Sequence, residues 1–268
     1  IIMKVSIFTT MTNPQKRMDP YIEALKCYED FADEVIIVGK NWPEEFSFDY
    51  IGKTFQEGFD LCTGDWVIRM DIDTFFHQND KDKLYKILSK NSDSPGIAFP
   101  KFQIFTPDRF NIKAKMCIAF NKKSYAKIKL NGGGDLCDPT LDGNLLDQHN
   151  LPNENIPIWN YDSVFKTQEI ISADRARFAR AWKSYFNNWG DRGGGSEEEA
   201  FKAWFLMIED RYKKHTLKLK LDDHPKYIIE KIKNLEKKQF GYDAFGLKDN
   251  IKRSSIDYLK NYKNYLTL

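Results

Sequence analysis

Two aspartates directly after a short apolar run have the spacing of a metal-binding pair. The run covers residues 66–68, and Asp71 and Asp73 follow it. Side chains two positions apart on an extended backbone point to the same side, so we expect these carboxylates to project together while Ile72 turns into the core. Such hard oxygen ligands suit Mg²⁺ or Mn²⁺, and either ion is well matched to a diphosphate. The pair therefore predicts a metal-dependent enzyme that acts on a nucleotide-linked substrate.

A second Asp-x-Asp, Asp80-Lys81-Asp82, lies only seven residues beyond Asp73. About two such matches are expected by chance in a chain this rich in aspartate, so the spacing alone carries little information. The second pair lies in a polar, lysine-rich stretch that predicts the start of a surface helix, where aspartates cap the helix and interact with its dipole. The apolar run before Asp71 distinguishes the first pair.

The composition is that of a globular protein of ordinary charge. The chain has 268 residues, of which 41% are hydrophobic, and its 41 basic and 39 acidic residues give a formal charge of +2. This length and composition allow a large buried core, and the charge balance does not favour a nucleic-acid partner. The four cysteines, Cys27, Cys62, Cys117 and Cys137, have no Cys-x-x-Cys spacing and are expected to be buried thiols in a reducing compartment. With neither a membrane-length apolar run nor a signal-peptide pattern, we expect a soluble, cytoplasmic protein.

The N-terminal part of the chain has the order of elements of a parallel α/β sheet. Residues 4–10 and 35–38 are rich in β-branched and aromatic side chains, and between them Asp19-Pro20 is a typical helix start followed by apolar residues at helical spacing. A strand, a helix and a second strand in under 40 residues predict a right-handed βαβ unit.

Further elements continue this alternation. The chain order predicts helices at 52–62 and 80–89 and strands at 96–99 and 114–120. In open α/β sheets, ligands collect at the carboxyl ends of the strands. The residues expected on that edge are Thr9, Thr10, Gly39, Asp71 and Asp73.

The second half of the chain is more irregular. Residues 131–143 are rich in glycine and aspartate and predict a long irregular loop, and residues 173–186 predict a helix rich in arginine and aromatic side chains. Ser196 and Glu199 form a capping-box pattern that opens another helix, and Pro225 predicts the first turn of one more. The basic, tyrosine-rich tail is expected to be helical.

The order of these elements and motifs resembles a GT-A glycosyltransferase of the family 2 type. Residues 56–65, Gln-Glu-Gly-Phe-Asp-Leu-Cys-Thr-Gly-Asp, are similar to that family's Asn-x-Gly-x-x-x-Ala-x-Gly-Asp lead-in to the metal strand. Residues 131–135, Asn-Gly-Gly-Gly-Asp, are similar to its Gly-Gly-Phe-Asp acceptor loop. At residues 38–41 the chain reads Val-Gly-Lys-Asn where the family often has Asp-Asp-Gly-Ser, so the resemblance does not identify the nucleotide. It spans residues 3–165 and implies a Rossmann-like, mostly parallel sheet in a GT-A domain over residues 1–190, with a C-terminal helical extension over 191–268.

The resemblance also implies how the site is built. Asp73 and Asp71 bind Mn²⁺ or Mg²⁺, although Asp71 has the alternative of contacting the ribose or the sugar. A histidine from the C-terminal part is the expected third ligand, and His224 is the candidate, against the alternative of a surface or helix-capping histidine. The residues expected to contact the nucleotide sugar are Thr9, Thr10, Gly39, Lys53 and Asp71. Arg69, like Lys53, has the alternatives of a phosphate contact and plain surface charge.

An inverting transfer needs a general base that takes the proton of the acceptor hydroxyl. By resemblance the base comes from the acceptor side, where Asp135, Asp138, Asp142 and Asp162 are available. We favour Asp138, which follows the glycine run closely, and Asp162, which lies between aromatic residues; the alternative for both is an ordinary turn or helix-cap aspartate.

The expected partners are a nucleotide-sugar donor and a glycan, lipid-linked or protein acceptor. The basic tail is compatible with peripheral contact to an anionic membrane, although a solvated helix face explains it equally simply.

Three other functions share part of these features. A haloacid-dehalogenase-like phosphatase also uses Asp-x-Asp, but its motif has Thr or Val where this chain has Phe75, and its pair normally lies on the first strand. A sugar-nucleotide nucleotidyltransferase should carry a glycine-rich basic loop after the first strand, and residues 9–16 contain no glycine. In a non-catalytic carbohydrate-binding protein, the carboxylates would only cap a turn.

Overall fold

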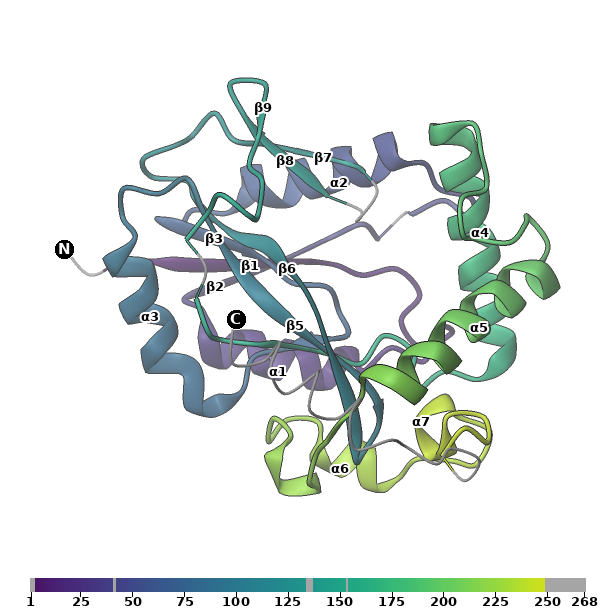
Figure 1. Cartoon of the computed structure of the whole chain (residues 1–268). Helices are drawn as coiled ribbons and strands as arrows, with labels where there is room; N and C mark the ends of the chain where they lie inside the picture. Colours follow the sequence, from purple (N-terminus) through teal and green to yellow (C-terminus); the bar gives the residue numbers. More distant parts are fainter. Residues whose placement is uncertain (1–2, 41, 134–136, 153, 249–268) are drawn as a thin grey trace.

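The computed structural model describes residues 3–40, 42–133, 137–152 and 154–248, and within them a mixed sheet forms the centre of the molecule (Figure 1). The strand order is β2-β1-β3-β6-β5-β10-β4, with β11 paired to β6. The sheet strands are β1 (Val5–Thr10), β2 (Glu34–Val38), β3 (Trp66–Arg69), β4 (Thr74–Phe75), β5 (Gly96–Thr106), β6 (Arg109–Asn121), β10 (Ile158–Asn160) and β11 (Leu217–Lys218). Strands β1, β2, β3, β5 and β10 run in one direction, whereas β6 and β4 run against them.

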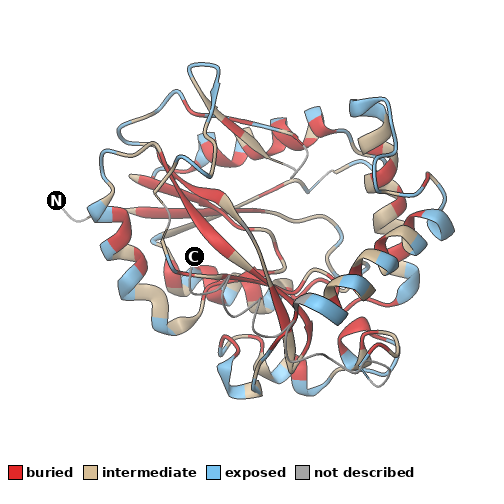
Figure 2. Cartoon of the chain, viewed as in Figure 1, coloured by how far each residue is buried: buried red, intermediate tan, exposed pale blue. Residues whose placement is uncertain are grey.

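Helices cover both faces of this sheet, as expected for a Rossmann-like α/β protein. The helices are α1 (Tyr21–Phe31), α2 (Phe48–Leu61), α3 (Lys81–Lys90), α4 (Gln168–Phe186), α5 (Glu197–His215), α6 (Ile229–Lys233) and α7 (Phe240–Asp243). Helices α1 and α3 lie on one face, and α2 lies on the other together with a small separate sheet of β7 (Lys129–Asn131), β8 (Asp138–Leu141) and β9 (Asn144–Leu145). The buried residues follow the central strands and the inner sides of these helices (Figure 2).

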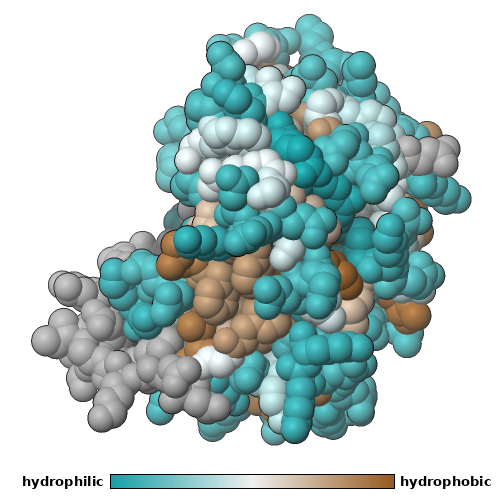
Figure 3. All heavy atoms as spheres, turned by 90° about the vertical axis from the view of Figure 1, so that its right-hand side faces the viewer, coloured by the Kyte–Doolittle hydropathy of each residue, from teal (hydrophilic) through white to brown (hydrophobic). Residues whose placement is uncertain are grey.

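Helices α5 and α7 pack against the far end of β5 through a third apolar cluster that includes Phe105, Trp204 and Phe240. Strand β11 also joins the central sheet. The surface on the side that carries α4 and α5 is largely hydrophilic around one apolar patch (Figure 3). The division at residues 190 and 191 stays a prediction. None of the helices in the described ranges is long and apolar enough to cross a membrane.

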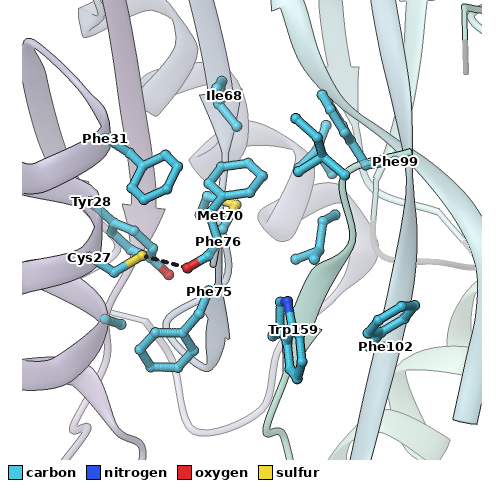
Figure 4. Packing of buried hydrophobic residues seen from close by; sticks show 14 of the residues in the cluster. Cys27, Tyr28, Phe31, Ile68, Met70, Phe75, Phe76, Phe99, Phe102 and Trp159 are labelled. Carbon is cyan, nitrogen blue, oxygen red and sulfur yellow. Dashed lines mark hydrogen bonds between the residues drawn. The ribbon is translucent and has the colours of Figure 1, made fainter. Parts of the chain in front are cut away.

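The core beneath β3 and β4 is aromatic and fixes the chain directly after the aspartate pair (Figure 4). Phe75 and Phe76 are fully buried; Phe75 packs edge-on to Tyr161, and Phe76 stacks on Phe31 with ring centroids 5.2 Å apart. The Cys27 thiol lies 3.6 Å from the carbonyl oxygen of Phe76. Burying two such rings is worth roughly 1.5–3 kcal/mol each, so the segment that precedes them is held firmly in place.

Most of the elements expected in the N-terminal half are confirmed. The βαβ unit is β1, α1 and β2, and the capping box at Ser196 opens α5. The strands expected at 96–99 and 114–120 are the part farthest from the turn of the much longer antiparallel hairpin β5–β6.

Three expectations are wrong. The stretch at 131–143 is not wholly irregular, because it contains β8. Pro225 does not begin a helix, since a turn follows it and α6 starts at Ile229. The strand with the aspartate pair ends at Arg69, before the pair, as described below. The helical tail falls largely on residues 249–268, which lie outside the described ranges.

Glycines allow the glycine-rich segment to lie directly on α2. A Cβ atom added at Gly132 would lie 1.6 Å from the backbone oxygen of Phe48, and one added at Gly52 would lie 2.4 Å from the backbone nitrogen of Gly132. The backbone around Gly132 cannot move away cheaply, because β7 pairs with β8 and the side chain of Leu130 is buried in the core. These glycines are therefore explained by close packing of two backbones.

We expect Gly132→Ala to lower the melting temperature, because the added methyl group overlaps the α2 backbone. Overpacking typically costs about 1–3 kcal/mol, and each kcal/mol corresponds to a shift of about 2–4 °C in a chain of this size. Thermal unfolding followed by circular dichroism measures the shift. Lys129→Ala, at an exposed position of the same segment, is the control. Equal melting temperatures of Gly132→Ala and wild type would contradict this explanation.

Candidate active site

The two aspartates lie on a tight turn beyond the end of β3. The backbone N–H of Thr74 donates to the carbonyl oxygen of Asp71 at 2.8 Å, which closes a β-turn. The same carbonyl accepts hydrogen bonds from the hydroxyl groups of Thr74 at 2.7 Å and Tyr28 at 2.6 Å. The extended backbone expected from the spacing is therefore wrong at this point, although Ile72 is buried as expected. The turn, not the strand pleat, sets the direction of the two carboxylates.

Asp71 is held by a buried arginine from the preceding strand. The guanidinium group of Arg69 donates to Asp71 Oδ1 at 2.6 Å and lies 4.8 Å from the ring centre of Phe55. The side chain of Arg69 is 2% exposed and that of Asp71 is 31% exposed. Arg69 therefore orients the carboxylate of Asp71 from the protein interior. Of the two alternatives for Arg69, plain surface charge is wrong, because its side chain is buried.

Asp73 lies in a crowded and mostly dry position. Asn160 donates its side-chain amide to Asp73 Oδ1 at 3.1 Å, and the backbone N–H of Tyr161 donates to the Asp73 carbonyl at 2.8 Å. Burial, together with the negative charges of Asp162 and Asp71, raises the pKa of Asp73 to about 7, against the opposing effect of Lys166. A cation placed beside Asp73 would offset the cost of burying this negative charge near other carboxylates. The carboxylate oxygens of Asp71 and Asp73 therefore fit Mg²⁺ or Mn²⁺.

One deeply buried lysine balances the carboxylates around this turn. The Lys166 side chain is 3% exposed, and its Nζ lies 3.2 Å from Asp19, 3.4 Å from Asp162 and 3.3 Å from Asp174. Burial lowers the pKa of Lys166, but Asp19 and Asp162 outweigh burial, so its pKa is raised and the ammonium group stays charged. Removing one partner of such a network leaves uncompensated charge, which is strongly destabilising.

Asp162 joins this network and lies close enough to Asp73 to interact with it electrostatically. It accepts hydrogen bonds from Arg175 on α4 and from Lys166. Burial would raise the pKa of Asp162, but Arg175 and Lys166 lower it well below the usual range, so this carboxylate is ionised at neutral pH. With its side chain 31% exposed, Asp162 remains reachable from solvent.

The residues that hold Asp162 were not singled out by sequence reasoning. The only local signals were the i,i+4 spacing of Asp162 and Lys166 and the arginine-rich stretch that became α4. Asp19, expected to cap α1, makes no capping hydrogen bond. Its carboxylate forms ion pairs with Arg17 and Lys166 instead. This network joins residues more than 140 positions apart.

The residues expected to bind the donor lie at the carboxyl ends of β1, β2 and β3, except for Lys53. Gly39 adopts the left-handed conformation at φ +81°, and a Cβ atom there would lie 3.6 Å from Thr10 and 3.2 Å from the ring of Trp42. Thr9 is buried, and its hydroxyl oxygen has no hydrogen-bond partner in the described part of the chain. Lys53 is exposed on α2 and makes no hydrogen bond or ion pair within the described residues.

His224 lies in the core with both ring nitrogens engaged. Its Nδ1 lies 2.8 Å from the Tyr161 hydroxyl and its Nε2 lies 2.8 Å from the carbonyl oxygen of Pro107. Because a carbonyl only accepts, Nε2 carries the proton and Nδ1 accepts from the tyrosine. The residue is fully buried, and burial lowers its pKa. This arrangement leaves no lone pair for a metal, so the assignment of His224 as third ligand is corrected.

The other base candidates lie on the glycine-rich side. Asp138 begins β8, and its carboxylate lies against Gly133. Both Asp71 and Asp138 raise the pKa of Cys137, although burial is the largest cause, so this segment approaches the aspartate turn. Asp142 is exposed in the turn after β8, and Asp135 lies outside the described residues. In the described residues, no cluster of three or more acidic, histidine or cysteine side chains is arranged to hold a metal.

Comparison with known proteins gives only distant similarities. No family model matches the sequence, and neither does any curated protein. A crystal structure of S. aureus TarS aligns with 98% of this chain and 55% of that chain, at 11% identity and a TM-score of 0.34. TarS 1–349 in complex with UDP-GlcNAc aligns with 99% of this chain and 92% of that chain, at 9% identity and a TM-score of 0.34. This chain thus spans about half the length of the longer TarS chain, and scores of this size establish neither a shared fold nor a shared function.

We expect Asp73→Asn to raise the melting temperature at pH 8 in the presence of a chelator. The folded protein has a pKa of about 7 at this carboxyl, whereas an unfolded aspartate titrates near 3.9, so the folded state binds more protons between these values. Ionised Asp73 therefore costs stability increasingly as the pH rises through this window, and the cost is fully present above pH 7. The amide removes it, which should raise the melting temperature by on the order of a few degrees.

The matched control for this measurement is Asp82→Asn, which changes the second aspartate of the other, exposed Asp-x-Asp. Its melting temperature should stay near that of wild type at every pH, whereas the gain of Asp73→Asn should shrink toward pH 4. A melting temperature of Asp73→Asn at or below wild type at pH 8 would show that Asp73 is not a destabilised carboxylate.

Proposed function

We propose that this protein is a metal-dependent glycosyltransferase that moves a sugar from a nucleotide-diphosphate donor to an acceptor hydroxyl. The observation that carries the proposal is a pair of carboxylates with opposite environments at one sheet edge. Asp73 is crowded and desolvated, so it favours a bound cation, whereas Asp162 beside it is held ionised by Arg175 and Lys166. One group suits a metal ion and the other suits a proton acceptor, and a transfer from a diphosphate donor needs both.

In this proposal Asp71 and Asp73 hold Mg²⁺ or Mn²⁺. Such ions keep several waters and are commonly bound by one or two carboxylates plus substrate phosphates, so two protein ligands suffice. Bound there, the ion neutralises charge that develops on the leaving diphosphate. Arg69 fixes one oxygen of Asp71, and Asn160 fixes one oxygen of Asp73. The donor's nucleoside would then lie toward the ends of β1 and β2, near Thr10, Gly39 and Trp42.

Asp162 is the proposed general base. Its lowered pKa makes it a weak base in the resting enzyme, but it guarantees the ionised form that accepts a proton. Arg175 and Lys166 hold the carboxylate in a fixed position, which reduces the cost of orienting it toward an acceptor hydroxyl. Asp138 is the second candidate, because its segment approaches Asp71. Transfer with inversion of the anomeric carbon goes with a single base of this kind.

The competing functions fit these contacts less well. A nucleotidyltransferase needs a basic, glycine-rich loop after β1 that binds phosphate. Residues 9–16 contain no glycine, and the Thr12 hydroxyl donates to the Gly39 carbonyl. A non-catalytic carbohydrate-binding protein needs no ionised carboxylate held by two cations beside a carboxylate of raised pKa. The ion-pair network around Asp162 therefore favours chemistry.

We expect calorimetry to detect binding of a nucleoside diphosphate only in the presence of Mn²⁺ or Mg²⁺, and Asp73→Asn to abolish it. Without an ion between them, the negatively charged diphosphate would be repelled by the carboxylates of Asp71 and Asp73. Asp82→Asn, in the second Asp-x-Asp, should bind as wild type does. Equal binding by wild type with and without chelator would refute the metal role.

Asp162→Asn should retain metal-dependent donor binding but lose transfer by about 10²–10⁴-fold, the usual contribution of a general base. A screen of sugar nucleotides by thermal shift supplies the donor, and product formation is then followed with each variant. Asp138→Asn tests the second candidate in the same assay, and Asp142→Asn is the control on an exposed turn. Wild-type rates in both Asp162→Asn and Asp138→Asn would remove both residues as bases.

A further inference from the structure

Basic side chains gather on the sheet face toward α5, beside the proposed active site. Lys101 on β5 and Lys113 on β6 are direct partners in the antiparallel ladder, and Gln103 and Asn111 are partners two residues along. Like charges directly opposite each other across two strands are destabilising. Neither lysine makes a hydrogen bond or an ion pair within the described residues. The fold therefore holds two lysine side chains together, at a cost whenever both are charged.

Two arginines from the covering helices complete this group. Arg211 on α5 donates to the side-chain oxygen of Gln103 at 3.4 Å, and Arg175 on α4 interacts electrostatically with both Arg211 and Lys113. We call Lys101, Lys113, Arg175 and Arg211 the basic cluster. Burial, then Lys101 and Arg211, lower the pKa of Lys113 to about 7. All four side chains remain partly exposed, so a ligand can reach them.

A row of amide side chains connects the basic cluster to the aspartate turn. Asn160, which binds Asp73, is the ladder partner of Gln103, and Gln103 is the ladder partner of Asn111. Ladder partners place their side chains on the same face. Asn111 is 5% exposed, and its side-chain oxygen has no hydrogen-bond partner in the described part of the chain. A buried polar atom without a partner is costly and indicates a position where a ligand or water completes the contacts.

We propose that the basic cluster binds a phosphate group carried by the acceptor substrate. That this phosphate belongs to the acceptor rests on the proposed function. Asp162, the proposed base, interacts with Asp73 on one side and with Lys101 and Arg175 on the other, so the basic cluster lies on the acceptor side of the base. Arg211 also interacts with Asp191 and Asp210, but Lys101 and Lys113 form no ion pair within the described residues, and a phosphate offers up to two negative charges and several acceptor oxygens. The donor diphosphate belongs to the metal site, so the phosphate in the basic cluster is a second one.

The test is binding of inorganic pyrophosphate in low salt and excess chelator, measured by calorimetry. Wild type and Asp73→Asn should bind it alike, since this binding needs no metal. Lys101→Gln/Lys113→Gln should weaken it by about tenfold or more, because each charge-assisted hydrogen bond contributes about 1.5–3 kcal/mol. Lys129→Gln/Lys202→Gln, which removes two exposed lysines elsewhere, should bind as wild type does.

Three outcomes overturn the inference. Equal weakening by the two double variants would show non-specific attraction, and competition by a nucleoside diphosphate in chelator would assign the basic cluster to the donor. Melting temperature checks the fold: relief of repulsion should leave Lys101→Gln/Lys113→Gln at least as stable as wild type without pyrophosphate, and a large loss of stability would show that the lysines are structural. Failure of the glycosyltransferase proposal is distinguishable, because it appears as loss of metal-dependent nucleotide binding while pyrophosphate binding persists.

Discussion

The site depends on one constraint: carboxylates are held closer together than their charges favour. The turn at residues 71–74 cannot relax, because Thr74 and Tyr28 bind the Asp71 carbonyl from two sides and Phe75 and Phe76 are anchored in the core directly after it. Repulsion and burial together raise the pKa of Asp73, and Lys166 offsets only part of the effect. Under the proposed function, a cation bound at this partly exposed edge would convert the unfavourable interaction into a favourable one.

The local pattern of the sequence was enough to locate this edge but not its geometry. Periodicity and turn residues predict β1, α1 and β2, and the apolar run before Asp71 distinguishes this aspartate pair from the one at Asp80. The turn itself could not be predicted, because one of the groups that hold it, the Tyr28 hydroxyl, comes from a helix 43 residues earlier in the chain. The same holds for Asp162, whose environment is set by Lys166 and Arg175 only once α4 packs against α5 and α2.

Two further residues show why residue type alone misleads. A histidine in the C-terminal part is a natural candidate for a metal ligand, yet His224 is a core residue that joins Tyr161 to the Pro107 carbonyl. A stretch rich in glycine and aspartate predicts an irregular loop, yet Gly132 is required by a close approach to α2. In both cases the structural role depends on a partner distant in sequence, and a single sequence contains no record of that partner.

The arrangement of charge along the sheet face limits what the protein can be. Carboxylates balanced by Arg69 and Lys166 lie at one end, the basic cluster lies at the other, and buried amides connect them, with Asp162 and Arg175 as the direct contact between the two groups. Apolar residues of similar volume would pack this face at lower cost, because buried charges seldom repay their desolvation. Burial, together with neighbouring charges of the same sign, displaces the pKa values of both Asp73 and Lys113 toward neutrality. Such a face is suited to a polar ligand assembly that presents positive charge at one end, through a metal ion, and negative charge at the other.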